Sequence, residues 1–127
     1  MYKVQDTEGR PLEEIRSYLA RKVQMSKDMG REGRLFANEI LQGAPRIGEH
    51  LSGDLQELFT RTTGMLTAWM DQRKIARVDP EHLLYSIWAT TQHYADFRSQ
   101  IDMLSGHGKI DSADAFLDQL YVKLLTP

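Results

Sequence analysis

The feature that most constrains this chain is the helical spacing of its apolar residues, which recurs in nearly every segment. In residues 49–73, large side chains follow one another at alternating steps of four and three positions, and three further apolar residues widen that stripe. The stripe comprises Leu51, Leu55, Leu58, Thr62, Met65 and Trp69, widened by Phe59, Leu66 and Met70. No segment shows the strict alternation of a strand, so we expect an all-α fold.

Helix-ending and helix-starting residues divide the chain into five predicted helices. Pro11 suits a first helical position, Gly30 and Gly43 suit helix ends, and Asp79 with Pro80 suits a capped start. The predicted helices cover 11–30, 31–42, 49–73 and 79–104, with a fifth that begins at a cap on Asp111 or Ser112. Gly64 inside the third helix indicates a close helix approach, a ligand facing bare backbone, or simply a tolerated glycine.

The fourth predicted helix is apolar on two sides, which is unusual for a chain of 127 residues. One side gathers Leu83, Ile87, Tyr94, Phe97, Ile101 and Leu104. The other gathers Leu84, Tyr85, Trp88, Ala95 and Met103, interspersed with Gln92, Asp96 and Ser99. We expect one side to pack inside the subunit and the other to meet a second copy, with the apolar fifth helix joining that contact. The alternative is a monomer whose other helices cover both sides.

Gln92 lies one turn from Trp88, and this pair is the candidate small-molecule site. An aromatic ring can stack a flat ligand, and a carboxamide offers two donors and an acceptor. The competing interpretation is that Gln92 bonds another buried polar group and that Trp88 is a core residue.

Catalysis and metal binding have little support in the sequence. The chain has no cysteine, and His93 with Asp96 lacks further ligands at metal-binding spacing, so we expect no metal, no cofactor and no catalytic residue. The formal net charge of -2 argues against non-specific binding of nucleic acid by this chain alone. The first residues are polar and no apolar run approaches a membrane span, so we predict a cytoplasmic protein with no membrane partner.

Four stretches together resemble one branch of the TetR family of transcriptional regulators. They are RLFANEILQGAP (34–45), GDLQEL (53–58), VDPEHLLYSIW (78–88) and IWATTQHYADF (87–97). The resemblance implies the five-helix C-terminal regulatory domain of that family, which binds an effector and forms homodimers through a four-helix bundle from the last two helices of each subunit. The branch includes a regulator of pyrimidine utilisation, which implies a pyrimidine or related planar effector contacted at Trp88 and Gln92.

The resemblance and the helical pattern together give two sets of predicted site residues. The ligand-binding set is Trp88, Gln92, Tyr85, Phe36, Met65 and Trp69. The dimer-interface set is Leu83, Ile87, Tyr94, Phe97, Phe116, Leu120 and Leu124. The chain contains no helix-turn-helix segment, so the resemblance implies DNA binding only through an N-terminal domain outside it. A stand-alone dimeric interaction module is the alternative, and a small helical enzyme using His93 and Asp96 is the third hypothesis.

Overall fold

The computed structural model describes residues 10–28 and 48–127, with side chains in the second range from residue 55 onward. Over these residues every regular element is a helix, so the prediction of an all-α fold is confirmed. The elements are α1 (Pro11–Asp28), α3 (Gly48–Asp71), α4 (Pro80–Asp96), α5 (Arg98–Ser105), the 3-10 turn η1 (Ile110–Ser112) and α6 (Ala113–Leu125). The predicted helix at 31–42, which includes Phe36, lies outside the described residues.

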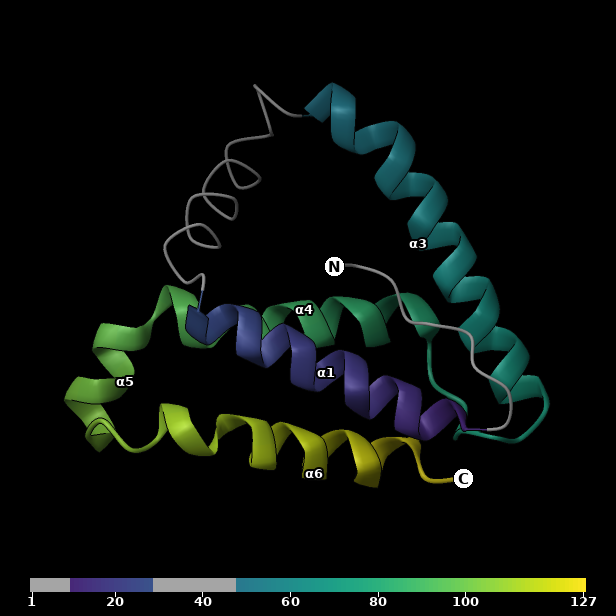
Figure 1. Ribbon diagram of the computed structural model, residues 1–127. Helices are drawn as coiled ribbons and strands as arrows, with labels where there is room; N and C mark the ends of the chain where they lie inside the picture. The colour runs from purple at the N-terminus through teal and green to yellow at the C-terminus, as the bar shows by residue number, and fades with distance from the viewer. Residues whose placement is uncertain (1–9, 29–47) are drawn as a thin grey trace.

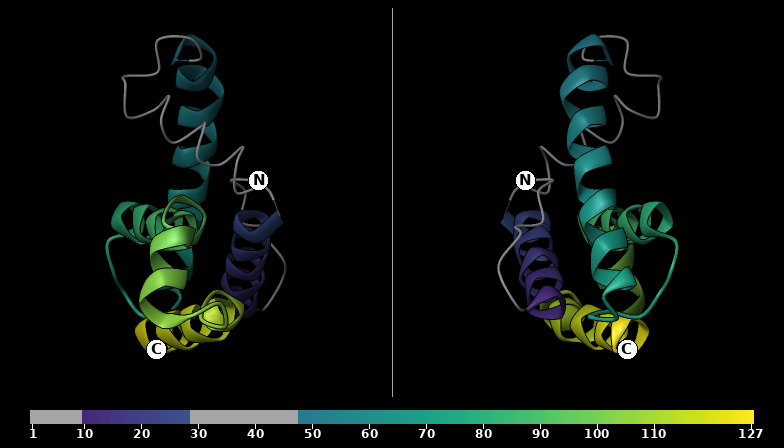
Figure 2. Two further views of the ribbon diagram at one scale, coloured as in Figure 1. Left: turned by 90° about the vertical axis from the view of Figure 1, so that its left-hand side faces the viewer. Right: turned by 90° about the vertical axis from the view of Figure 1, so that its right-hand side faces the viewer.

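Three helices form the body of the fold. α1 packs along both α4 and α6, and the three run side by side in Figure 1. α3 contacts α4 and then leans away from the other helices, as both views in Figure 2 show. The short α5 turns the chain between α4 and η1, so that α6 runs back along α1.

The core lies where these helices meet, and it holds side chains from α1, α3, α4, η1 and α6. The fully buried hydrophobic residues include Ile15, Tyr18, Leu19, Val23, Leu66, Trp69, Met70, Ile75, Leu83, Leu84, Ile87, Ala95, Ile110, Ala113, Leu117, Tyr121 and Leu125. Burial of a large apolar side chain contributes about 1.5–3 kcal/mol of transfer free energy. The apolar spacing of α1 and α6 is thus explained by their mutual packing.

The start of α4 confirms the predicted cap, but its predicted end is wrong. Asp79 Oδ1 accepts hydrogen bonds from the backbone N–H groups of Glu81 at 2.9 Å and His82 at 3.0 Å. The helix was predicted to continue to residue 104, whereas it ends at Asp96 and α5 begins at Arg98. Phe97 has φ −118° and ψ 27°, outside the helical region, although its N–H still bonds to the His93 carbonyl at 2.9 Å. Without a glycine or proline there, the sequence carries no signal for this break.

The structure also bears on the predictions for Gly64 in α3 and for the start of α6. No described atom lies within 4 Å of a Cβ placed on Gly64, and the residue is exposed, so none of the described helices approaches it closely, which favours a tolerated glycine. Ser112 is the cap position of α6, yet its hydroxyl donates to the Lys109 carbonyl at 3.0 Å and makes no cap bond to the helix. The 3-10 turn η1 begins the helix in place of a side-chain cap.

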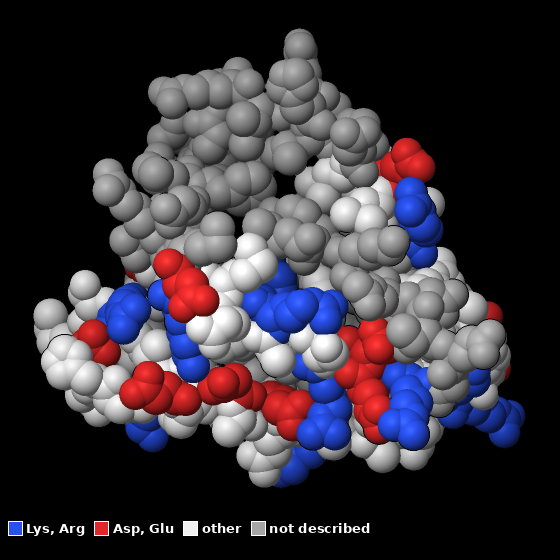
Figure 3. Space-filling model, viewed as in Figure 1, with Lys and Arg blue, Asp and Glu red and all other residues white. Residues whose placement is uncertain are grey.

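Oppositely charged side chains join α1 to α6 across the face shown in Figure 3, where acidic and basic groups are interspersed. Arg16 forms two bonds to the Asp118 carboxylate, at 2.8 and 2.9 Å, and Lys27 lies 3.4 Å from Asp114. The hydrogen bond to Asp118 raises the pKa of Arg16. Exposed ion pairs of this kind contribute little to the free energy of folding. Their main effect is on the register in which α1 and α6 pack.

Candidate functional site

An aromatic cluster lies between α3 and α4, on the side of α4 that carries Trp88. The rings of Phe59 and Tyr85 stack with centroids 5.7 Å apart, and each lies 6.2 Å from Trp88. His82 meets the Tyr85 ring edge-on at 5.8 Å. Tyr85 remains 45 % exposed, so this cluster is an accessible aromatic surface and not a closed part of the core.

The indole of Trp88 is fixed to α1 by a hydrogen bond. Its Nε1 donates to the hydroxyl of Tyr18 at 2.9 Å, and Tyr18 is almost completely buried. About two turns further along α1, the hydroxyl of Ser26 donates to the Thr91 carbonyl at 2.7 Å. These two bonds hold the Trp88 side of α4 against α1, and they give the indole a single orientation.

Gln92 is bonded within α4. Its Nε2 donates to Asp96 Oδ1 at 3.1 Å, and both side chains are partly buried. The competing interpretation of Gln92, a hydrogen bond to another polar group, is therefore realised for the amide nitrogen. Among the residues that the structure describes, no group donates to the amide oxygen, which leaves it as an acceptor.

The remaining predicted ligand residues are placed at different depths. Trp69 belongs to the core at 4 % exposure, and Met65 packs against the core from a partly buried position. The structure therefore brings Tyr85 and Trp88 together at an accessible surface, with Gln92 one turn further along α4. It sets Trp69 behind them, inside the subunit.

Two of the predicted interface residues lie in the core of the single chain. Leu83 and Ile87 are 3 % and 1 % exposed, so they face neither solvent nor a second copy. The buried stripe of α4 runs through Ile87, Thr91 and Ala95, because the Thr91 hydroxyl donates to the Ile87 carbonyl at 2.7 Å and needs no further partner.

The other predicted interface residues border an open apolar face. Phe97, Phe116, Leu120 and Leu124 are between 41 % and 59 % exposed, and Tyr94 is partly buried. A shallow groove with a volume of about 370 Å³ lies between α4 and α6 on this face. Its lining is mainly apolar: Ala89, Thr90, His93, Tyr94, Phe116, Leu117 and Leu120.

His93 belongs to this apolar face and not to the Gln92 site. Its ring stacks on Phe97 with centroids 4.8 Å apart and meets Tyr94 edge-on at 6.1 Å. Asp96, three residues further on, is bonded to Gln92 instead. In the parts of the chain that the structure describes, no group of three potential metal ligands comes together.

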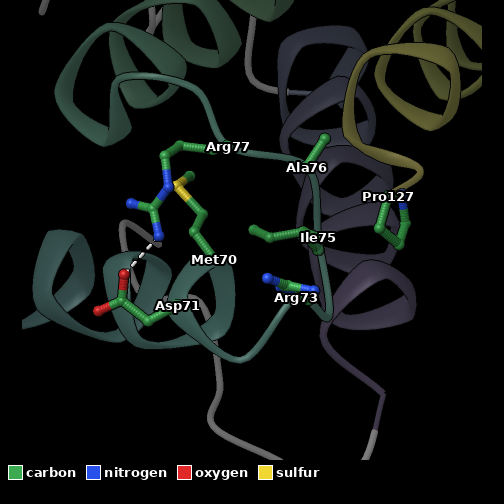
Figure 4. A pocket seen from close by; sticks show the side chains of 7 residues that line it. All are labelled: Met70, Asp71, Arg73, Ile75, Ala76, Arg77 and Pro127. Carbon is green, nitrogen blue, oxygen red and sulfur yellow. Dashed lines mark hydrogen bonds and ion pairs between the residues drawn. The ribbon is translucent and has the colours of Figure 1, made fainter.

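A second pocket, of about 520 Å³, lies at the turn between α3 and α4 (Figure 4). Its lining includes Met70 and the buried Ile75, and Arg77 pairs with Asp71 at its edge. The N–H of Ala76 donates to the Leu125 carbonyl at 2.8 Å, which fastens this turn to the end of α6. None of the predicted ligand residues lines this pocket.

Reasoning from sequence missed two residues at the Trp88 site. Tyr18 bonds to Trp88, and Asp96 bonds to Gln92. Lys22 lies on α1 one turn after Tyr18, and burial lowers the pKa of its ammonium. Asp96 was visible as the residue four positions after Gln92, a spacing that brings side chains together on a helix. The partners from α1 carry no such signal, because only the tertiary packing of α1 on α4 brings them there.

Comparison with known proteins connects this geometry to a family. The family model described as YcdC-like protein, C-terminal region, a TetR-type C-terminal model, matches residues 2–127. This chain belongs to that family. The HTH-type transcriptional regulator RutR of Escherichia coli K12 is 41 % identical over 96 residues, which is 76 % of this chain and 45 % of that protein. Its counterparts from Escherichia coli O157:H7 and Shigella flexneri match over the same shares at the same identity.

The match confirms that the chain is a C-terminal regulatory domain of the TetR type. The relatives carry the name of transcriptional regulators, and the matched part is less than half of their length. Within the described residues, no helix is long and apolar enough to cross a membrane.

Proposed function

We propose that this chain is the effector-binding and dimerisation domain of a transcriptional regulator, in which binding of a planar small molecule at Trp88 and Gln92 changes DNA binding. The observation that carries the proposal is the division of α4 into two functional sides. One side holds the Trp88–Gln92 row, and the other borders an open apolar face shared with α6. A domain that must sense a ligand and hold two copies together needs both sides on connected elements.

Homodimer formation through α4 and α6 is supported by the exposed Phe116, Leu120 and Leu124, which lie at successive turns of α6. Large apolar side chains in one row with a groove beside them are typical of an interface. Leu83 and Ile87 have no part in this proposal because the core buries them.

Substitution of Leu120 by Glu tests the interface. We expect Leu120→Glu to convert a dimer into a 14.6 kDa monomer in sedimentation equilibrium, since a charge in an apolar interface cannot be solvated there. Ala115→Glu is the matched control, because it adds the same charge to an exposed position about 140° away from Leu120 around α6. Dimers of undiminished affinity in Leu120→Glu contradict the proposed interface.

The effector proposal rests on the aromatic cluster and on the free acceptor of Gln92. Rings at Tyr85 and Trp88 can cover a flat heterocycle, and the amide can bond its edge. Resemblance to the pyrimidine-utilisation branch supports a pyrimidine base, and uracil and thymine are the first probes.

Titration calorimetry with these two bases tests the site. Gln92→Ala is expected to weaken binding about tenfold, the effect of losing one well-formed hydrogen bond. Gln100→Ala, which removes an exposed glutamine from α5, is the control and leaves affinity unchanged. If neither base binds, or if Gln92→Ala binds them as the unaltered chain does, the proposed site is wrong.

The proposal further includes control of DNA binding by an N-terminal domain and a cytoplasmic location. Finding a helix-turn-helix segment encoded in frame upstream would support the control of DNA binding, and an operator affinity that changes with the effector would test it. A stand-alone dimeric module predicts dimers with no such segment. No enzymatic role for His93 and Asp96 is included, since the one is stacked on Phe97 and the other is bonded to Gln92.

A further inference from the structure

We infer that association of this domain into dimers depends on pH, with His93 as the switch. Two copies associate while both imidazoles are neutral, and they separate when the imidazoles become protonated. The inference rests on the proposed function, because it assigns a regulatory group to the proposed dimer face.

His93 lies in the apolar groove between α4 and α6. Its ring is exposed in the single chain and stacks on Phe97, with 4.8 Å between the ring centroids and 27° between the ring planes. Within the part of the chain that the structure describes, the ring nitrogens of His93 have no hydrogen bond or ion pair. Water therefore solvates them in the single chain, whether the imidazole is neutral or protonated.

A second copy changes the surroundings of this ring. His93 lines the same groove as Phe116 and Leu120, so a copy that covers these two side chains also covers the imidazole. A two-fold dimer brings the same face of each subunit together, so one interface holds two such rings. Burial disfavours the charged form of a histidine, and the dimer consequently binds fewer protons than two separate chains.

The charged side chains of α6 do not offset this cost. Tyr94 is the other titratable residue that lines the groove. The acidic side chains of α6, Asp114 and Asp118, pair with α1 instead. Lys123 lies three residues after Leu120, on the same side of α6, and its positive charge opposes protonation of a nearby imidazole.

The charges next to His93 along its own segment act alike in the single chain and in the dimer. Asp96 lies three residues after His93, and its carboxylate accepts the bond from Gln92. Arg98 follows Phe97 at the start of α5. Because both groups belong to the same chain as His93, they favour protonation of neither state over the other.

Sedimentation equilibrium of the purified chain at pH 7.5 and pH 5.5 tests the inference. Exclusion of two protons from the dimer allows its dissociation constant to rise by up to about 100-fold per pH unit. We expect a rise of at least about tenfold between these two pH values, because histidine changes its charge in this range. His93→Gln and His93→Phe remove the titratable group, so their dissociation constants should change by less than about twofold.

His107→Gln is the matched control, because His107 is exposed in the loop after α5 and its replacement should keep the rise of the unaltered chain. Circular dichroism at 222 nm should stay the same at both pH values, and its loss at pH 5.5 would overturn the inference. A dissociation constant that does not change with pH, or an equal rise in His93→Gln, overturns the inference and leaves the proposed dimer in place. A chain that is monomeric at pH 7.5 contradicts the proposed dimer and the inference with it.

Discussion

The Ser86–Tyr121 hydrogen bond joins α4 to α6 and allows a prediction with a definite sign. The Ser86 hydroxyl donates to the Leu83 carbonyl at 2.8 Å, so the 2.8 Å contact between Ser86 Oγ and Tyr121 Oη needs the proton of tyrosine. Thr90 likewise donates to the Ser86 carbonyl, at 2.7 Å. The tyrosine is thus a buried donor whose main acceptor is a serine.

Tyr121→Phe and Ser86→Ala should therefore differ in cost. Tyr121→Phe removes a donor and strands no other donor, so it should lower the free energy of unfolding by about 1 kcal/mol, the net contribution of one hydrogen bond. Ser86→Ala leaves the buried tyrosine hydroxyl without its acceptor, which should lower the free energy of unfolding by about 1–3 kcal/mol. Thr90 Oγ1, 3.4 Å away, can accept only a weak replacement bond. The double variant should be no less stable than Ser86→Ala alone, because no donor is then left unpaired.

Urea unfolding followed by circular dichroism at 222 nm measures all three variants at one protein concentration, since association changes apparent stability. In a thermal scan, 1 kcal/mol corresponds to about 4 °C for a domain of this size. Strictly additive losses in the double variant, or a greater loss from Tyr121→Phe than from Ser86→Ala, would refute this assignment of the protons.

Two further predictions follow from single positions. Gly64→Ala should raise the free energy of unfolding by about 0.5–1 kcal/mol, because Gly64 is exposed inside α3 and no described atom lies near its missing Cβ; a loss of stability in urea unfolding contradicts this. Burial lowers the pKa of Lys22 below its value of 10.5 in the unfolded chain. The unfolded chain therefore keeps this proton to a higher pH than the folded chain, and the free energy of unfolding rises with pH between the folded and the unfolded pKa. Lys22→Met should therefore stabilise the chain at neutral pH, and this advantage should shrink toward pH 10.5; an advantage that is independent of pH contradicts the origin of the shift.

The fold class and most helix starts follow from local rules that the sequence displays directly. Asp79 and Pro80 show why: a cap and a first-turn proline act within four residues, so the chain needs no tertiary information to begin α4 there. The end of α4 at Phe97 lacks such a local signal. It depends on the turn through α5 that brings α6 back to α1.

The site could be predicted only along a single helix. The row from Tyr85 through Trp88 to Gln92 follows from periodicity, and Asp96 continues it. Which face of α4 is core could not be read from the wheel, because Thr91 satisfies its own hydroxyl and packs as an apolar residue. The contribution of Tyr18 depends on how α1 lies across α4, a relation between segments 70 residues apart.

The two hydrogen bonds from α1 to α4, at Trp88 and at the Thr91 carbonyl, make α4 a single rigid element whose two sides carry different groups. Side chains project about 5–6 Å from a helix axis. A rotation of α4 about its axis by about 10° therefore displaces the side chains on its two sides by about 1 Å, in opposite directions. Such a rotation is too small to alter the shape of the subunit. It would still shift any group that packs against His93 and Phe97.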